Sequence, residues 1–142
     1  MPITCKDLNA FSSRITANTP DETDIRAAIS RSYYAAFHAV LPFVERLPDS
    51  AKCRPNATHV THVEMTERLK EWRTAGVHSR LAKMTATGEQ LASAIQTART
   101  AREKADYRLG AQVLPGEAAT QIGRAKKVML MMAQLENEIN RP

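Results

Sequence analysis

The sequence predicts an all-α protein, an antiparallel bundle of about five helices, and three observations lead to that fold class. The chain has only five glycines among 142 residues and is rich in alanine, a composition that favours helices over sheets. Apolar residues recur three and four positions apart over long stretches, which is the spacing of one helix face. No segment alternates apolar and polar residues, so we expect no sheet. Short connections make neighbouring helices antiparallel.

The first predicted helix covers residues 5–16, where three apolar residues lie at helical spacing: Leu8, Phe11 and Ile15. The second, residues 19–46, has the clearest start signal in the chain. Thr19 can act as its N-cap, with Pro20 at the first helical position and Glu22 completing a capping box. Pro42 can kink its last turns. Its apolar face is expected to comprise Ile25, Ile29, Tyr33, Ala36, Val40 and Val44.

The middle and end of the chain hold the remaining helices. Residues 47–57, with two prolines, form a loop. A third helix begins near Thr58 or Thr61, runs to about residue 75, and ends at Gly76 as a C-terminal cap. The fourth segment, 77–106, is weakened in its middle by Thr85, Thr87 and Gly88, so it can be two helices. After a loop at 107–116, the last helix covers 117–139, with this apolar face: Ile122, Ala125, Met129, Met132, Leu135 and Ile139.

Composition restricts the class of protein. A length of 142 residues suits a single domain, 1–142. The net charge of +5 and isoelectric point near 9.5 are compatible with an RNA, DNA or nucleotide partner, and the excess charge is spread along the chain rather than gathered in a tail. Cys5 and Cys53 show no zinc-binding spacing and read as free thiols. With no signal peptide and no apolar run long enough for a bilayer, we expect a cytoplasmic protein.

The stretch RSYYAAFH, residues 31–38, brings several functional side chains together. Arg31 and His38 are seven residues apart, close to two helical turns, so they share a face with Tyr34 between them. These three side chains flank the apolar stripe and emerge at its edge. They can line a catalytic or binding cleft, or they can be the polar rim of a buried face.

A second constellation lies in ARTAREKADYRLG, residues 98–110. Arg99, Arg102 and Asp106 occupy one helix face at spacings of three and four, with Glu103 beside them. Arg102 and Asp106 can pair, which would make this a salt-bridged helix end. Alternatively, the arginines bind phosphate and the carboxylates hold them in place.

His59 and His62 are three residues apart at the predicted start of the third helix. Such a pair can share a metal ion, but no third and fourth ligand stands at a useful spacing. A neutral histidine that hydrogen-bonds to a loop is the simpler interpretation. The chain also lacks a phosphate-binding glycine loop and a dinucleotide fingerprint. We therefore expect no metal and no cofactor.

With both constellations considered, the chain resembles the HEPN superfamily (higher eukaryotes and prokaryotes nucleotide-binding). The resemblance rests on AAISRSYYAAFHAV at 27–40, which has the R-x-YYA-x-F-x-A row of an early helix in small prokaryotic members, and on AREKADYRL at 101–109, which has their later R-E-x-A-DY row. Through order and length it covers about residues 5–140. His59 or His62 falls where such proteins often carry a histidine.

The resemblance implies an all-α bundle, often a homodimer, with polar residues in a cleft between helices. Many members are metal-independent endoribonucleases of toxin–antitoxin, phage-defence or CRISPR-linked systems, and toxin members often pair with a nucleotidyltransferase-type antitoxin. Their chemistry needs a histidine near the ribose 2′-hydroxyl and an arginine on the phosphate. Alternatively, this chain is a catalytically inactive HEPN module that binds a nucleotide, RNA or a partner.

The nuclease motif of the family has an arginine, a polar residue and then a histidine within four to six positions, typically in a late helix. Here no histidine follows Arg102, whereas Arg31, Ser32 and His38 fit the spacing at its upper limit in the early helix. The resemblance thus implies Arg31 on the phosphate and His38 in proton transfer. Residues with supporting or phosphate-binding roles would be Tyr34, Arg99, Arg102, Asp106 and Tyr107.

Overall fold

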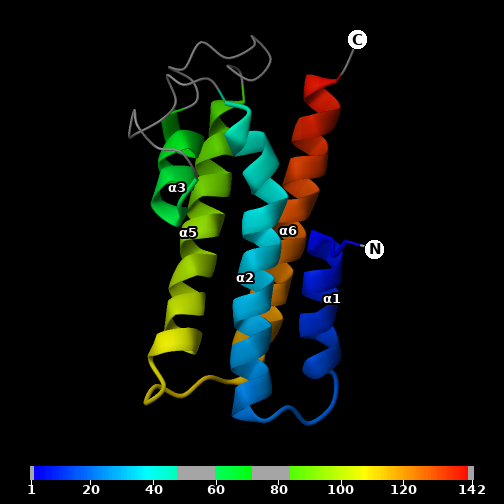
Figure 1. The fold of residues 1–142 in the computed structure, drawn as a ribbon, viewed down its shortest axis with the longest axis vertical. Helices are drawn as coiled ribbons and strands as arrows, with labels where there is room; N and C mark the ends of the chain where they lie inside the picture. The colour runs from blue at the N-terminus through cyan, green and yellow to red at the C-terminus, as the bar shows by residue number, and fades with distance from the viewer. Residues whose placement is uncertain (1, 48–59, 72–83, 141–142) are drawn as a thin grey trace.

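The computed structural model describes residues 2–47, 60–71 and 84–140, and these ranges form an all-helical bundle (Figure 1). The helices are α1 (Cys5–Ile15), α2 (Glu22–Glu45), α3 (His62–Glu71), α5 (Thr85–Tyr107) and α6 (Pro115–Ile139). Along the long axis α1, α2, α5 and α6 alternate in direction. The described part of the chain contains no strand. The predicted all-α antiparallel bundle is confirmed.

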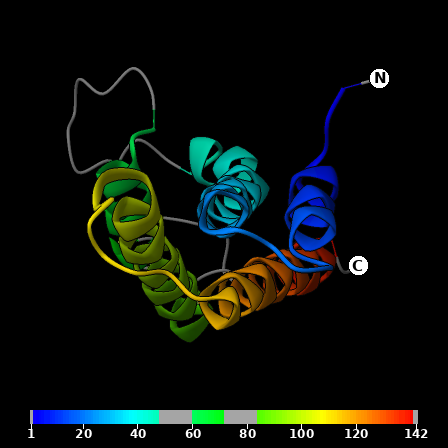
Figure 2. The same cartoon turned by 90° about the horizontal axis from the view of Figure 1, so that it is seen from below.

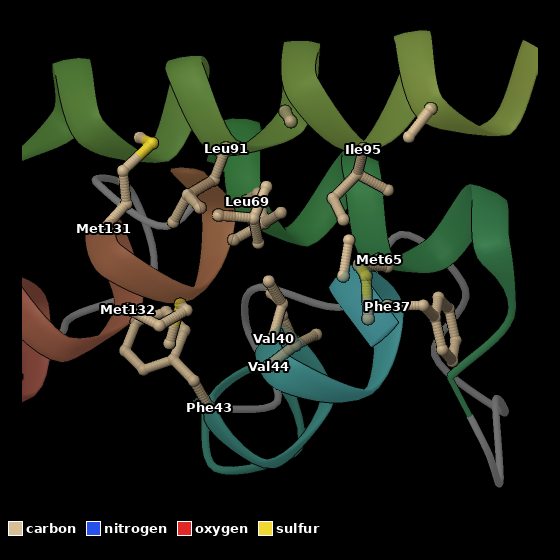
Figure 3. Packing of buried hydrophobic residues seen from close by; sticks show 14 of the residues in the cluster. Phe37, Val40, Phe43, Val44, Met65, Leu69, Leu91, Ile95, Met131 and Met132 are labelled. Atoms are coloured by element: carbon tan, nitrogen blue, oxygen red, sulfur yellow. The ribbon is translucent and has the colours of Figure 1, made fainter. Parts of the chain in front are cut away.

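The central helix is α2, which packs against all four of the others. Seen along the bundle, it lies between α1 on one side and α5 on the other, with α6 along a third side (Figure 2). The predicted apolar face of α2 is buried throughout: Ile25, Ile29, Tyr33, Ala36, Val40 and Val44. At one end of the bundle, Val40 and Val44 pack with Leu69 of α3 and Leu91 of α5 (Figure 3). Met131 and Met132 of α6 close the same cluster.

The start of α2 differs from the prediction by two residues. Asp21 is its N-cap: the Asp21 carboxylate accepts a hydrogen bond from the Asp24 backbone N–H at 2.8 Å, and the Asp24 carboxylate accepts one from the Asp21 N–H at 3.2 Å. Aspartate is at least as good a cap as threonine, and its charge complements the helix dipole. The predicted capping box from Thr19 was therefore wrong. Pro42 lies inside α2, which continues to Glu45.

The other boundaries agree with the predictions to within a few residues where the structure describes them. The described part of the fourth predicted segment is one helix, and Thr85 and Gly88 lie in its first turn rather than its middle. Because Pro115 occupies the first helical position, α6 begins two residues earlier than predicted. Of the loop predicted at 47–57, residues 48–57 lie outside the described residues, as do Gly76 and residues 77–83.

The face of α1 that packs inward carries polar side chains as well as two residues of the predicted stripe, because Leu8 and Ile15 pack against the core. Phe11 is 38% exposed, whereas Asn9 and Ser12 are buried. Ser12 Oγ donates to the Ala28 carbonyl at 2.8 Å, and Asn9 Nδ2 donates to the Ile122 carbonyl at 3.2 Å. Ser32 Oγ donates to Asn9 Oδ1 at 2.8 Å. These hydrogen bonds satisfy polar groups that would otherwise be costly to bury, and they hold α1 against α2 and α6.

A single arginine holds the connection between α5 and α6. Nη1 of Arg26 donates to the carbonyls of Lys104 at 3.2 Å and Ala105 at 2.8 Å, and its other nitrogen pairs with Glu22 at 2.9 Å. Arg26 also donates to three further carbonyls in the connection, those of Arg108, Leu109 and Ala111. The Lys104 carbonyl also accepts the backbone N–H of Arg108 at 3.1 Å. Arg26 adds a side-chain donor to carbonyls at and beyond the end of α5, so it acts as the C-terminal cap of that helix.

None of the helices in the described ranges is both long and apolar enough to pass through a lipid bilayer.

Candidate functional site

A buried arginine surrounded by aromatic rings marks the region where α2 meets α5. The guanidinium carbon of Arg102 lies 5.3 Å from the ring centre of Tyr33, 5.7 Å from that of Tyr34 and 5.5 Å from that of Tyr107. Arg102 is only 6% exposed. Cation–π contacts on this scale, in a site with little water, stabilise a buried guanidinium that could not otherwise be tolerated.

The contacts of Arg102 with Tyr34 and Asp106 use the same nitrogen. Nη1 donates to the Tyr34 hydroxyl at 3.5 Å and lies 3.4 Å from Asp106 Oδ2. Ser30 Oγ donates to the same Asp106 oxygen at 3.1 Å. Nε of Arg102 is buried and has no hydrogen-bond partner within the described part of the chain. Because aromatic rings cover the guanidinium, these contacts favour a positioning role for Arg102 over direct contact with a phosphate.

His62, at the start of α3, joins the same group of side chains. Its Nδ1 shares a hydrogen bond with the Tyr33 hydroxyl. Its ring centre is 4.9 Å from that of Phe37, 5.3 Å from that of Tyr33 and 6.3 Å from that of Tyr34. Burial lowers the pKa of His62 below its usual 6.5, and the positive charges of Arg102 and Arg99 lower it further. The imidazole is therefore neutral at pH 7.

Tyr33 is a protonated phenol under the same conditions. Its side chain is fully buried, and this burial raises its pKa although the neighbouring arginines act in the opposite direction. A buried phenol needs a hydrogen-bond partner, and His62 supplies it.

His38 and Arg31, the two residues expected to carry chemistry, have different surroundings. His38 is exposed, and its ring stands edge-on to Phe37 with 5.5 Å between centres and 6.3 Å from Tyr34. It therefore contacts the same aromatic side chains as His62. Arg31 is exposed on α2 and makes no hydrogen bond or ion pair with any described residue. The two side chains remain open to solvent.

Arg99 already forms an ion pair, so it is less available to bind a phosphate than an unpaired arginine would be. Its Nε lies 2.9 Å from Glu103 Oε1, an ion pair that does not have hydrogen-bond alignment. Tyr107 covers Arg102 with its ring yet is 71% exposed. The i,i+4 pairing expected between Arg102 and Asp106 is present at 3.4 Å. These contacts favour the salt-bridged helix end over an open arginine cluster.

We refer to these side chains as the Arg102 cluster. It comprises Tyr33, Tyr34, Phe37, His38, His62, Arg102, Asp106 and Tyr107. Two imidazoles, one buried guanidinium and three phenols thus meet around the middle of α2. Such a group can transfer protons, donate hydrogen bonds to an anion and stack against a planar base.

His62 is the member of the cluster for which the sequence analysis predicts no definite role. Sequence spacing linked it to His59 as a weak metal pair or to a loop, whereas the structure pairs it with Tyr33. His59 lies outside the described residues. Among the described residues there is no group of three side chains able to hold a metal ion. The contact between residues 33 and 62 depends on how α3 packs on α2, which no local pattern reports.

Comparisons of this chain with protein-family models, curated proteins and solved structures found no match. The HEPN resemblance therefore stays a prediction that rests on its two motifs.

Proposed function

We propose that this protein is a HEPN-type RNA-acting protein, a metal-independent endoribonuclease of a cytoplasmic toxin–antitoxin or phage-defence module. The observation that carries the proposal is that His38 and His62, from different helices, contact the same aromatic side chains, Tyr34 and Phe37. RNA cleavage by its own 2′-hydroxyl needs a proton acceptor and groups that stabilise the charged phosphate, and these residue types can supply both.

In the proposed reaction, solvent-exposed His38 accepts the proton of the ribose 2′-hydroxyl. The 2′-oxygen then attacks phosphorus, and the bond from phosphorus to the 5′-oxygen breaks. The proton held by His38 returns through water to the leaving 5′-oxygen. The products are a 2′,3′-cyclic phosphate and a 5′-hydroxyl, so the step is a transesterification that consumes no further reactant.

The negative charge that develops on the phosphate must be stabilised by hydrogen-bond donors to its oxygens. Arg31 is exposed and has no described partner, so its guanidinium is free to bind a phosphate oxygen. His62 contributes differently. When the buried Tyr33 hydroxyl donates to Nδ1, the neutral imidazole keeps its proton on Nε2 and can donate it in a hydrogen bond. Arg102 and Asp106 then position Tyr33 and Tyr34 rather than contact the RNA.

The same proposal includes partners. A homodimer and a nucleotidyltransferase-type antitoxin are what the resemblance implies, and RNA is the substrate. The exposed ring of Tyr107, adjacent to Arg102, offers a surface on which a nucleobase could stack.

The test is cleavage of a single-stranded RNA by the purified protein with EDTA present, which removes metal-dependent contaminants. We expect cleavage that leaves cyclic phosphate ends. His38→Ala should abolish it, and His62→Ala should reduce it strongly. Arg14→Ala, which alters an exposed arginine of α1 away from the cluster, serves as the matched control and should retain wild-type activity. Undiminished cleavage by His38→Ala would sink the catalytic assignment.

A second candidate function is a catalytically inactive module that binds nucleotide, RNA or a partner. It is favoured by the burial of Arg102 under three rings, which removes the arginine of the later motif from direct contact with a phosphate. Protein that never cuts RNA but binds it with an affinity that falls steeply as salt rises would support this alternative. Under it, Arg31→Ala weakens binding and His38→Ala leaves it unchanged.

A further inference from the structure

A groove with an apolar floor lies between α1 and α6, and it is separate from the Arg102 cluster. Its volume is about 560 Å³. Its lining comes from α1 and α6, which lie side by side (Figure 2), and α1 packs mainly on α2 and makes fewer contacts with α6. The two helices run in opposite directions along it (Figure 1).

The floor of the groove is apolar and open to solvent. It is formed by Ala10 of α1 and by Met129, Leu130 and Ala133 of α6. Leu130 is 59% exposed, so most of its side chain is available to a ligand in the groove. The small side chains of Ala10 and Ala133 let another backbone approach closely.

Besides the lysines, two polar side chains line the groove, Asn9 and Ser13, and the buried one, Asn9, is already satisfied. Its amide donates to the Ile122 carbonyl and its oxygen accepts from Ser32. No unsatisfied amide therefore attracts a polar ligand to the floor. What the groove offers is apolar area.

The rim of the groove is positively charged. Lys6 and Lys126 line it, and none of the lining residues is a carboxylate. Neither lysine forms an ion pair with any residue that the structure describes. The nearest acid on α1, Asp7, is held by Thr4 in the capping box of that helix. A ligand that lies on this floor and carries negative charge at its edges would be complementary.

We propose that the α1–α6 groove binds an amphipathic helix of a partner protein, with its apolar side chains on Leu130 and its carboxylates at Lys6 and Lys126. A helix suits the site because α1 and α6 use their backbone groups internally, so an extended peptide would find no backbone partners there. A second copy of this chain is a poor occupant, since a symmetric contact would bring the four lysines of two copies together. This inference does not depend on the proposed function.

The test uses a fluorescein-labelled helical peptide of about four turns, with leucines at i, i+4, i+7 and i+11 and glutamates flanking them. Fluorescence anisotropy measures its binding to the full chain. We expect the glutamate peptide to bind and the same peptide with lysines in place of glutamates not to bind. Raising the salt from about 50 to about 300 mM should weaken the interaction.

Variants localise the binding. Leu130→Glu should weaken it about tenfold or more, and it should leave the melting temperature unchanged because the side chain is exposed. The double change Lys6→Glu with Lys126→Glu should reverse the preference, so that the lysine peptide binds better. Lys127→Glu is the matched control, since this exposed lysine neighbours Lys126 but does not line the groove. It should change affinity by less than about threefold.

Several results would overturn the proposal. They are no binding of the glutamate peptide at about 1 mM, equal binding of both peptides, or unchanged binding by Leu130→Glu. If sedimentation shows a dimer that Leu130→Glu dissociates, and the peptide fails to bind, the groove is a self-association surface and the proposal is wrong. It is also wrong if phosphatidylserine vesicles, and not the peptide, bind the protein through Leu130.

Discussion

The hydroxyl of Tyr33 and Nδ1 of His62 share a hydrogen bond across 29 residues of sequence, and this bond ties α3 to the central helix α2. Tyr33 is fully buried and contacts Arg102 with its ring, so one side chain joins α2, α3 and α5. The tyrosine is therefore both a core residue and the support of a candidate functional histidine. Four predictions follow from contacts of this kind.

Tyr33→Phe should destabilise the protein by about 1–2 kcal/mol, because it keeps the ring and leaves His62 without its hydrogen-bond partner. Tyr34→Phe is the matched control. The Tyr34 hydroxyl receives only a 3.5 Å bond from Arg102, so its removal should cost clearly less. Urea unfolding of the two variants measures the difference. Equal costs would mean that the bond between Tyr33 and His62 contributes nothing of its own.

The stability of the protein should depend on pH through His62. Its pKa is lowered in the folded state, so below 6.5 the unfolded chain binds the proton more readily than the folded one. The stabilisation is fully present above 6.5 and is lost as the pH falls through the folded pKa. Urea unfolding at pH 7.5 and pH 5 should show a larger loss for wild type than for His62→Gln. Parallel losses in both proteins would contradict the expected protonation of His62.

Arg102→Ala should destabilise the protein by about 2–4 kcal/mol, since it removes a buried side chain that contacts three tyrosine rings and leaves a cavity. Arg99→Ala, one turn earlier on α5, changes a partly exposed arginine with one ion pair and should cost about 0–1 kcal/mol. Thermal unfolding of both variants provides the comparison. A tolerated Arg102→Ala would indicate that the cluster has no structural importance.

Arg26→Lys should cost about 1–3 kcal/mol, because an ammonium cannot reach the several carbonyls that the planar guanidinium of Arg26 joins at the end of α5. Hydrogen exchange should rise locally in residues 108–114. Arg46→Lys is the control, since Arg46 forms one exposed ion pair, with Glu136 at 2.7 Å, and one hydrogen bond to the Pro42 carbonyl of its own helix. Its change should cost under about 1 kcal/mol. Unchanged exchange in the connection would show that Arg26 does not hold it.

The fold was largely predictable because its signals are local. Apolar residues at intervals of three and four predicted the buried face of α2, and all six residues of that stripe are buried. The predicted starts of α1, α2 and α6 lie within two residues of those in the structure. The errors arose where polar residues compete for a helix cap or for a buried position. Asp21 replaced Thr19 as a cap, and Asn9 and Ser12 turned inward in place of Phe11 because α2 and α6 offered them hydrogen-bond partners.

The sequence by itself determined which residues share a helix face, and so it brought Tyr34 together with His38 and Arg102 with Asp106. Helical periodicity is enough for such pairs. Only the tertiary structure decided that Arg102 is buried under three tyrosine rings from α2 and α5, that His62 pairs with Tyr33, and that a lysine-rimmed groove opens between α1 and α6. Those features depend on how separate helices pack, and burial and pKa follow from packing, which no local pattern encodes.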